Sequence, residues 1–196
     1  LRGETGTGKE LVAMAIHRRG ARHDKPLVSL NMASIPAGLA VSELFGHGRG
    51  AFSGAISDQP GHILRATGGT LFLDEVGDTT PEVQTMLLRV LETQEVVPLG
   101  GGAAVKVDVR LIAATDAPLE IMSADGRFRA PLLHRLSGFT IYIPPLRSRI
   151  DDIGRLFADF VREAALETGQ MAALEAAPGE ATPWIPSRIM RALVAH

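Results

Sequence analysis

The segment Gly3-Glu4-Thr5-Gly6-Thr7-Gly8-Lys9 decides the fold of this chain. It matches the pattern G-x-x-x-x-G-K, in which glycines let backbone N–H groups turn inward around a phosphate while the lysine reaches the β and γ oxygens. A helix predicted over residues 9–19 follows and adds the positive end of its dipole. Glu10 stands where Ser or Thr usually meets Mg²⁺. On this motif alone, a Gly-rich connecting turn therefore remains an alternative.

A second motif, Leu71-Phe72-Leu73-Asp74-Glu75, is an apolar strand that ends in two adjacent acids. Strand alternation sends the two carboxylates in different directions, so Asp74 can hold Mg²⁺ while Glu75 orients and polarises an attacking water. Taken alone, this segment is better interpreted as a strand with solvated acids at its end. Together the two motifs supply a cradle for phosphate and an anchor for its metal.

The rest of the chain alternates short apolar runs with segments of helical period, which is typical of a parallel sheet covered by helices. In the first helix, Leu11, Val12, Ala15 and Ile16 are predicted to share one face. The predicted strands are 27–31, 70–74, 107–114 and 139–143; the predicted helices begin at Pro81, at Asp151 and at Ser187; and residues 95–106 are predicted to form a hairpin or loop.

Composition excludes several classes of protein. The 196 residues carry a net charge of −2 with no cysteine, so disulfides, thiolate nucleophiles and Cys-based zinc sites are excluded, which fits a reducing cytoplasm. The charge gives no global attraction to nucleic acid or anionic lipid. No apolar run reaches the ~18 to 20 residues of a membrane span.

The segment Gly50-Ala51-Phe52-Ser53-Gly54-Ala55, called here the tip loop, follows Glu43-Leu44-Phe45-Gly46-His47-Gly48-Arg49. Glycines near both ends make it flexible, and a phenylalanine in such a loop suits burial against a partner. From loop physics alone, Phe52 folding back into the core is the more frequent outcome. The sequence leaves both interpretations open at this point.

These motifs together resemble the central AAA+ ATPase domain of bacterial enhancer-binding proteins, the activators of sigma-54 RNA polymerase. The family patterns G-E-[ST]-G-T-G-K-E, E-L-F-G-H-x-x-G-A-F-[TS]-G-A and G-G-T-L-F-L-D-E match residues 3–10, 43–55 and 68–75. The resemblance makes Glu10 expected. It implies a three-layer α/β P-loop NTPase with a parallel sheet, followed by a partial helical lid.

The resemblance also implies roles for particular residues. Residues 3–10 with Asp74 would bind Mg-ATP (Walker A and Walker B), and Glu75 would activate water. Asn31 would hold Glu75 away from water until the partner signals, since an amide can hydrogen bond a carboxylate without changing its charge. The alternative is that Asn31 merely ends a strand and has no role in the reaction. Arg129 and Arg135, in a segment that resembles F-R-x-D-L-x-x-R-L, would reach the neighbouring subunit's nucleotide, although one of them could be structural.

The expected activity is ATP-driven remodelling of sigma-54 RNA polymerase closed complexes, in a ring that is expected to be a hexamer, in the bacterial cytoplasm. The tip loop, residues 50–55, would contact sigma-54, and Pro98–Lys106 is similar to the second pore loop. Contact with promoter or enhancer DNA is expected only through domains outside this chain, and no membrane partner is expected. The alternatives are a P-loop ATPase that acts on another protein or nucleic acid, and a nucleotide-binding regulatory module without turnover.

The sequence departs from the family pattern at several positions. Asp116 replaces the usual Asn of the sensor near the γ-phosphate and adds negative charge there, so Thr115 could carry the sensing instead. Ser53 replaces a commoner Thr, Gly48 stands where an acid is frequent, and Pro131 stands where Asp is usual. These changes put the local positioning of the loop and of the arginines in doubt, and leave the overall interpretation unchanged.

Two parts are expected along the chain. Residues 1–145 are expected to form the nucleotide-binding core, with most of its first strand missing, and residues 146–196 a partial lid. The segment Pro144-Pro145 marks the boundary between them. Because only Leu1 and Arg2 precede the phosphate loop, the chain is interpreted as an excerpt of a longer protein.

Overall fold

The structure is a computed structural model that describes residues 1–167 and residue 169. The chain divides into two units, Leu1–Ile143 and Pro144–His196. The second unit therefore begins at Pro144, the first residue of the Pro144-Pro145 segment, whereas the expected core extends to residue 145. The helix predicted from Ser187 lies outside the described residues. Within the described part of the chain, no helix is both long and apolar enough to cross a bilayer.

The first unit is built on a parallel three-stranded sheet. Its strands are β1 (Leu27–Asn31), β4 (Thr70–Asp74) and β7 (Arg110–Ala113), in the order β1-β4-β7. Leu27 pairs with Thr70, and Thr70 with Arg110, so the carboxyl ends of the strands align at one edge. That is the edge where ligand sites of open α/β sheets lie.

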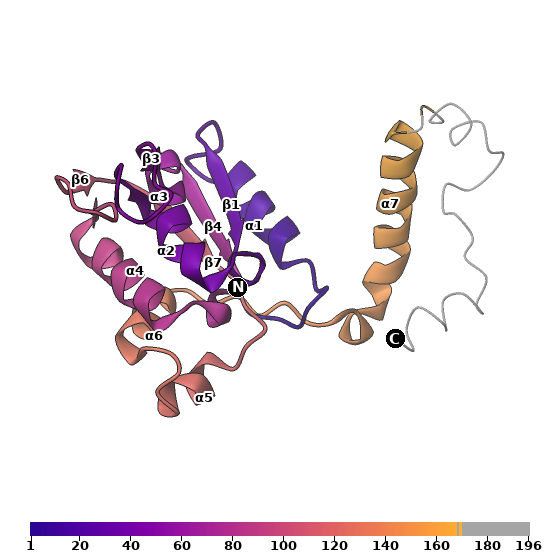
Figure 1. The fold of residues 1–196 in the computed structure, drawn as a ribbon. Coiled ribbons are helices and arrows are strands. Elements are labelled where there is room, and N and C mark those ends of the chain that lie inside the picture. Colours follow the sequence, from indigo (N-terminus) through magenta and orange to yellow (C-terminus); the bar gives the residue numbers. More distant parts are fainter. Residues whose placement is uncertain (168, 170–196) are drawn as a thin grey trace. The chain divides into compact units, whose positions relative to one another are not determined.

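Successive side chains of β4 point to opposite faces of the sheet, and each face has its own hydrophobic core. Leu71 and Leu73 point into the larger cluster, which includes Leu44 of α2 (Ala37–Phe45) and Leu87 of α4 (Pro81–Thr93). Phe72 points to the opposite face, where it joins Ala13 of α1 (Lys9–Arg18). Helix α1 therefore covers one face of the sheet and α2 and α4 cover the other (Figure 1). The predicted three-layer α/β fold is confirmed.

Helix α1 turns a different face inward from the predicted one. Its buried residues are Lys9, Ala13 and His17, whereas Leu11 is 57% exposed. Lys9 must face the phosphate loop, so positions four and eight residues later face the sheet with it. The buried His17 places Nδ1 2.9 Å from Thr70 Oγ1. The position of the loop lysine, rather than the apolar pattern, decided the rotation of this helix.

Shorter elements complete the first unit. They are η1 (Met32–Ser34), β2 (Gly46–His47), β3 (Gln59–Pro60), α3 (His62–Arg65), η2 (Val76–Asp78), β5 (Glu95–Val96), β6 (Val105–Lys106), α5 (Leu119–Ala124) and α6 (Ala130–Leu136). Strands β2 and β3 pair antiparallel, as do β5 and β6, which confirms the hairpin predicted over residues 95–106.

The strand predicted over residues 139–143 does not form as a regular element. Tyr142 makes an isolated parallel bridge with Arg2, which also bridges Thr115. Arg2 N donates to Ile141 O at 2.8 Å, and Ile143 N donates to Arg2 O at 2.8 Å. The pairing covers only this short stretch, and Phe139 is 84% exposed. Residues 1–3 thus lie between the end of β7 and residues 141–143, where they hold the phosphate loop at the carboxyl edge of the sheet.

In the second unit, the short helices η3 (Leu146–Ser148) and η4 (Ile150–Asp152) precede α7 (Ile153–Glu167). Helix α7 falls within the helix predicted from Asp151.

Candidate nucleotide site and partner loop

The phosphate loop, residues 3–9, wraps around its own lysine. Gly6 and Gly8 adopt φ of 82° and 88°, a left-handed conformation that other residues rarely adopt. Lys9 begins α1 and is only 6% exposed. Its Nζ donates to Gly3 O at 3.1 Å and to Glu4 O at 3.4 Å. The loop carbonyls therefore hold the ammonium group at the centre of the loop.

The two chemical motifs meet at this lysine. Lys9 Nζ lies 3.4 Å from Glu75 Oε1, across 66 residues of sequence. Glu75 has φ 50° and ψ 51°, which is an uncommon conformation for a non-glycine residue. The turn is fixed by Val76 N, which donates to Ala114 O at 3.0 Å. Backbone strain of this kind is concentrated at functional sites, and here it aims the Glu75 carboxylate at the phosphate loop.

Asp74 and Glu75 have different surroundings because β4 ends at Asp74 and the left-handed turn at Glu75 redirects the chain, whereas strand alternation was the predicted cause. Asp74 Oδ2 accepts from Asn31 Nδ2 at 3.4 Å. Its Oδ1 is buried, and no described residue hydrogen bonds to it. A buried carboxylate oxygen without a donor suits a cation.

Among the described residues, no three His, Cys, Asp or Glu side chains gather into a metal site. Mg²⁺ usually takes one or two carboxylates and completes its shell with substrate phosphates and water. Asp74, which precedes the Glu75 that contacts Lys9 of the phosphate loop, fits that requirement.

Asn31 lies at the same strand end as Asp74, with which it pairs in register. Its amide contacts Asp74 and not Glu75, so the expected contact between Asn31 and Glu75 is not formed in this arrangement. The other end of the amide is also used, because Asn31 Oδ1 accepts from Ala33 N at 2.9 Å and caps η1. The parallel register decides this contact, since it sets Asn31 beside the last residue of β4 and one residue short of Glu75.

Residues 115 and 116 follow β7 at the carboxyl edge of the sheet. The Thr115 side chain is buried, and its Oγ1 accepts from Ala117 N at 3.0 Å. Asp116 instead reaches the phosphate loop, where its Oδ2 accepts from Thr5 Oγ1 at 2.6 Å. Asp116 N also approaches Glu75 Oε2 at 3.4 Å. In this arrangement, Asp116 contacts the site directly while the Thr115 hydroxyl caps a local turn.

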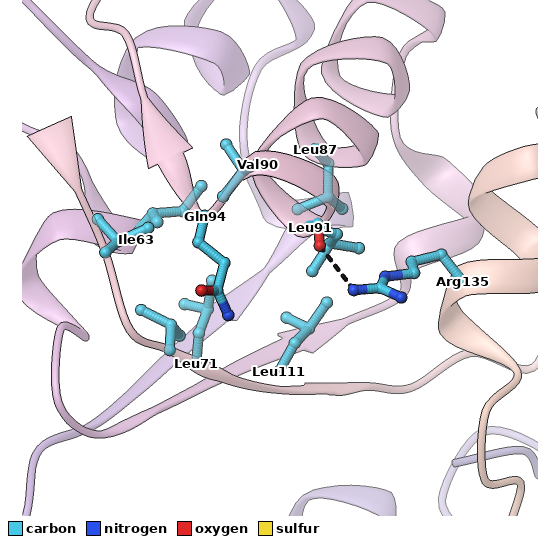
Figure 2. Close-up of a pocket in the computed structure, with 10 residues that line it drawn as sticks. Ile63, Leu71, Leu87, Val90, Leu91, Gln94, Leu111 and Arg135 are labelled. Atoms are coloured by element: carbon cyan, nitrogen blue, oxygen red, sulfur yellow. Dashed lines mark hydrogen bonds between the residues drawn. The ribbon is translucent and has the colours of Figure 1, made fainter. Parts of the chain in front are cut away.

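The two arginines of α6 contact α4 of their own chain. Arg129 precedes α6, and its Nη1 donates to Thr85 Oγ1 at 2.9 Å. Arg135 lies in the last turn, and its Nη2 donates to Leu91 O at 2.9 Å (Figure 2). Figure 2 shows this guanidinium among the residues that line a pocket. The pocket has a volume of about 140 Å³, and most of its lining residues are apolar. Both arginines are exposed, so their guanidinium groups are accessible from outside this chain.

The tip loop is closed by short backbone bonds. Gly50 N donates to Ala55 O at 2.9 Å, and Ala55 N donates to Phe52 O at 3.0 Å. Phe52 is 40% exposed and packs edge-on against the His47 ring, with the ring centroids 5.0 Å apart. The side chain is therefore neither in the core nor fully in solvent.

The second glycine loop, residues 98–106, runs beside the tip loop. Gly48 N donates to Leu99 O at 2.9 Å, and Leu99 N donates to Gly46 O at 3.0 Å. Gly100 has φ 85°, and a Cβ placed on it would lie 2.7 Å from Ala51 Cβ. The second glycine loop is thus hydrogen-bonded to the segment that leads into the tip loop, and Gly100 packs closely against Ala51 of the tip loop.

One residue at this site is visible only in the structure. Gln84 is buried on the apolar face of α4, where its Nε2 donates to Thr79 O and Arg127 O at 2.9 and 3.2 Å. Its Oε1 accepts from Arg129 N at 2.9 Å. This amide therefore fixes the backbone of Arg129. The sequence signal that could have found it is a polar residue beside Val83 on the buried side of an amphipathic helix.

Comparison with known proteins gives consistent matches. A family model described as the sigma-54 interaction domain matches residues 1–142. The DNA-binding transcriptional regulator NtrC of Klebsiella pneumoniae is 53% identical over 169 residues, which cover 86% of this chain and 36% of that protein. The Nif-specific regulatory protein of Azospirillum lipoferum is 50% identical over 175 residues, which cover 89% of this chain and 28% of that protein.

Among solved structures, NtrX from Brucella abortus in complex with ADP matches with a TM-score of 0.83 and 38% identity, over 100% of this chain and 40% of that one. The same protein in complex with ATP matches with a TM-score of 0.77 and 37% identity, over 99% of this chain and 45% of that one. The chain spans less than half the length of each of these relatives.

Proposed function

Because this chain belongs to the sigma-54 interaction domain family, the AAA+ P-loop domains of sigma-54-dependent transcriptional activators, we propose that it hydrolyses Mg-ATP between the subunits of a ring. The energy would remodel the closed promoter complex of the sigma-54 RNA polymerase holoenzyme. The observation that carries the proposal is the 3.4 Å approach of Lys9 Nζ to Glu75 Oε1. The adjacent residue Asp74 adds a buried Oδ1 that accepts no hydrogen bond from the part of the chain that the structure describes.

The chemistry assigned to the phosphate loop follows from its contacts. Lys9 Nζ is held by two carbonyls and one carboxylate, and these bonds can be exchanged for β- and γ-phosphate oxygens at little cost in desolvation. Once Lys9 binds phosphate, the Glu75 carboxylate is free to accept a proton from a water molecule in line with the γ-phosphate. Asp74 Oδ1 is the atom that would hold Mg²⁺, and the ion would neutralise negative charge on the phosphates when bound.

Arg129 and Arg135 are proposed to complete the site of the neighbouring subunit. Arginine suits this role because its guanidinium group remains charged and can hydrogen bond to two phosphoryl oxygens at once. Their bonds to Thr85 Oγ1 and Leu91 O lie at the surface, so exchange for a neighbour's phosphate is inexpensive. An arginine supplied in trans is typically worth ~10³ to 10⁵ in rate. An isolated subunit should therefore be a poor ATPase, and we propose a hexameric ring as the active form.

The tip loop is proposed to be the part that contacts sigma-54. The chain runs from Asn31 through η1 and two further residues into α2, which ends at Phe45, and the loop hairpin begins at Gly46. A change at Asn31 and Asp74 on nucleotide turnover would therefore move α2 between two packed arrangements and reposition Phe52.

Asp116 favours a second candidate, a nucleotide-binding regulatory module without turnover. Its carboxylate is bonded to the phosphate loop at Thr5, where negative charge opposes phosphate. The remaining alternative is an ATPase that remodels another protein or a nucleic acid.

The test uses the full-length protein that contains this chain, in its assembled form. Steady-state ATPase activity and equilibrium ATP binding are measured for the parent and for Glu75→Gln. We expect turnover in the parent, and for Glu75→Gln we expect nucleotide binding with turnover lost. Absence of turnover in the assembled parent would establish the regulatory module. Sigma-54 binding is then measured with ADP–aluminium fluoride and with ADP, and equal binding in both states would contradict sigma-54 as the partner.

A further inference from the structure

His47 joins three segments at the base of the tip loop. Its Nδ1 lies 2.6 Å from Ser42 Oγ, on the buried side of α2. Its ring meets the Phe52 ring at an interplanar angle of 64°, with the centroids 5.0 Å apart. Its backbone pairs with Gln59 in β3 and forms a bridge to Leu99 in the second glycine loop. One imidazole therefore touches both the helix that leads from the nucleotide site and the aromatic tip.

The contacts of His47 fix the orientation of its ring. The backbone is held on both sides by pairing, and the short bond to Ser42 Oγ sets the ring plane. An edge-to-face contact depends on that plane, since the positive edge of one ring must meet the negative face of the other. Rotation or displacement of α2 moves Ser42, and the imidazole then presents a different surface to Phe52.

The tip loop needs such a contact because its backbone is permissive. Gly50 and Gly54 flank Phe52 with φ of 81° and 112°. Because glycine has no Cβ, these two positions let the loop adopt many conformations. A partly buried ring contact selects one of them, in which 40% of Phe52 remains exposed.

We propose that His47 is a positioning residue for the partner-binding loop, and that it transmits the position of α2 to Phe52 through Ser42. In the arrangement described here, it keeps the phenylalanine withdrawn against the base of the loop. This inference rests on the proposed function, because the partner that reads the position of Phe52 is sigma-54. The physical contact can be tested without that partner.

The first experiment measures the contact itself. Full-length protein carries 4-fluorophenylalanine at position 52, and its ¹⁹F resonance is recorded in the ADP state without sigma-54. In His47→Ala the resonance should move toward the value of the free amino acid, because the ring current is lost. In Ser42→Ala it should move in the same direction by less. His23→Ala, a change at an exposed histidine that contacts Gly20 O, is the control and should leave it unchanged. An unchanged resonance in His47→Ala would overturn the proposal, whether or not sigma-54 binds.

The second experiment measures the consequence. Sigma-54 affinity is determined with ADP–aluminium fluoride and with ADP, and the ratio of the two affinities reports nucleotide control of the loop. An aromatic pair of this kind has an energy equivalent to about a 2- to 10-fold change in an equilibrium. In His47→Ala the ratio should fall by that factor, through tighter binding in ADP. The ATPase rate of the assembled protein should be unchanged, whereas general damage to the fold would lower it.

A double-mutant cycle tests the relay through Ser42. If Ser42 acts through His47, the double variant should show the same affinity ratio as His47→Ala alone. Additive effects would contradict the relay. If the parent shows no sigma-54 binding while the ¹⁹F shifts occur, the proposed function fails and the contact between His47 and Phe52 stands.

Discussion

Asp116 Oδ2 accepts a 2.6 Å hydrogen bond from Thr5 Oγ1, and this bond joins the loop after β7 to the phosphate loop. The two residues lie 111 positions apart in sequence. The backbone N of Asp116 also approaches Glu75 Oε2, at 3.4 Å. The Asp116 carboxylate thus adds a negative group to the phosphate loop at Thr5.

Asp116→Asn should tighten ATP binding. The amide oxygen can still accept from Thr5 Oγ1, so the geometry is kept while the charge is removed. Loss of a like charge near phosphate at an intermediate dielectric is worth about 1 to 2 kcal/mol, or about 5- to 30-fold in affinity. Equilibrium ATP binding at two salt concentrations measures this, with Asp125→Asn as the control because Asp125 pairs with Arg127 at the surface. Unchanged affinity would mean that Asp116 turns away when nucleotide binds.

Gly100→Ala should uncouple the two loops. The added Cβ would lie 2.7 Å from Ala51 Cβ and 2.9 Å from Ala51 Cα, and one of the two loops must then shift. Overpacking of this kind costs about 1 to 3 kcal/mol. Sigma-54 binding in the ADP–aluminium fluoride state should weaken, and the ATPase rate of the assembled protein should not change.

Gly101→Ala is the matched control for that variant. Gly101 has φ 90°, close to the 85° of Gly100, and has no atom within 4 Å of an added Cβ. Both variants carry the same backbone strain, so the difference between them isolates the contact with Ala51. Equal loss of sigma-54 binding in the two would show that strain alone is responsible.

Gln84→Met should destabilise the domain. It should also lower the ATPase activity of the assembled protein, which is proposed to depend on Arg129 reaching the neighbouring subunit's nucleotide. Methionine leaves Thr79 O, Arg127 O and Arg129 N without their partner, and each unpaired buried group costs about 1 to 3 kcal/mol. The free energy of unfolding, measured in urea, should fall by about 3 kcal/mol or more. Thr85→Ala removes the exposed partner of the Arg129 guanidinium and should cost less than about 0.5 kcal/mol. Similar losses in both would contradict the buried role of Gln84.

Arg135→Ala and Glu75→Gln should complement each other in mixed assemblies. Each variant alone should lose most ATPase activity, by about 10³-fold or more for the arginine. A mixture places an intact Glu75 next to an intact Arg135 of a neighbouring subunit, so activity should partly return. Steady-state ATPase activity over a range of mixing ratios measures this. No recovery at any ratio would mean that Arg135 acts within its own chain, where it contacts Leu91 O.

Local patterns were enough to predict the elements that carry the site. Strands 27–31 and 70–74 were predicted with the observed bounds, because each is a short apolar run that ends in a polar residue. The hairpin at residues 95–106 follows from its central glycines. The predicted buried face of α1 was wrong, because the need for Lys9 to face the phosphate loop outweighs the apolar pattern of Leu11 and Val12.

The sequence by itself determined which residues could bind phosphate, metal and partner, because those motifs depend on residue type and on spacing within one element. Only the tertiary structure decided which of them touch. Asn31 meets Asp74 through the parallel register, Arg135 meets Leu91 through the packing of α6 on α4, and Asp116 meets Thr5 across the edge of the sheet. The physical reason is that periodicity reports the environment of a backbone segment, whereas contacts between distant residues depend on strand order and on how each loop turns at the sheet edge.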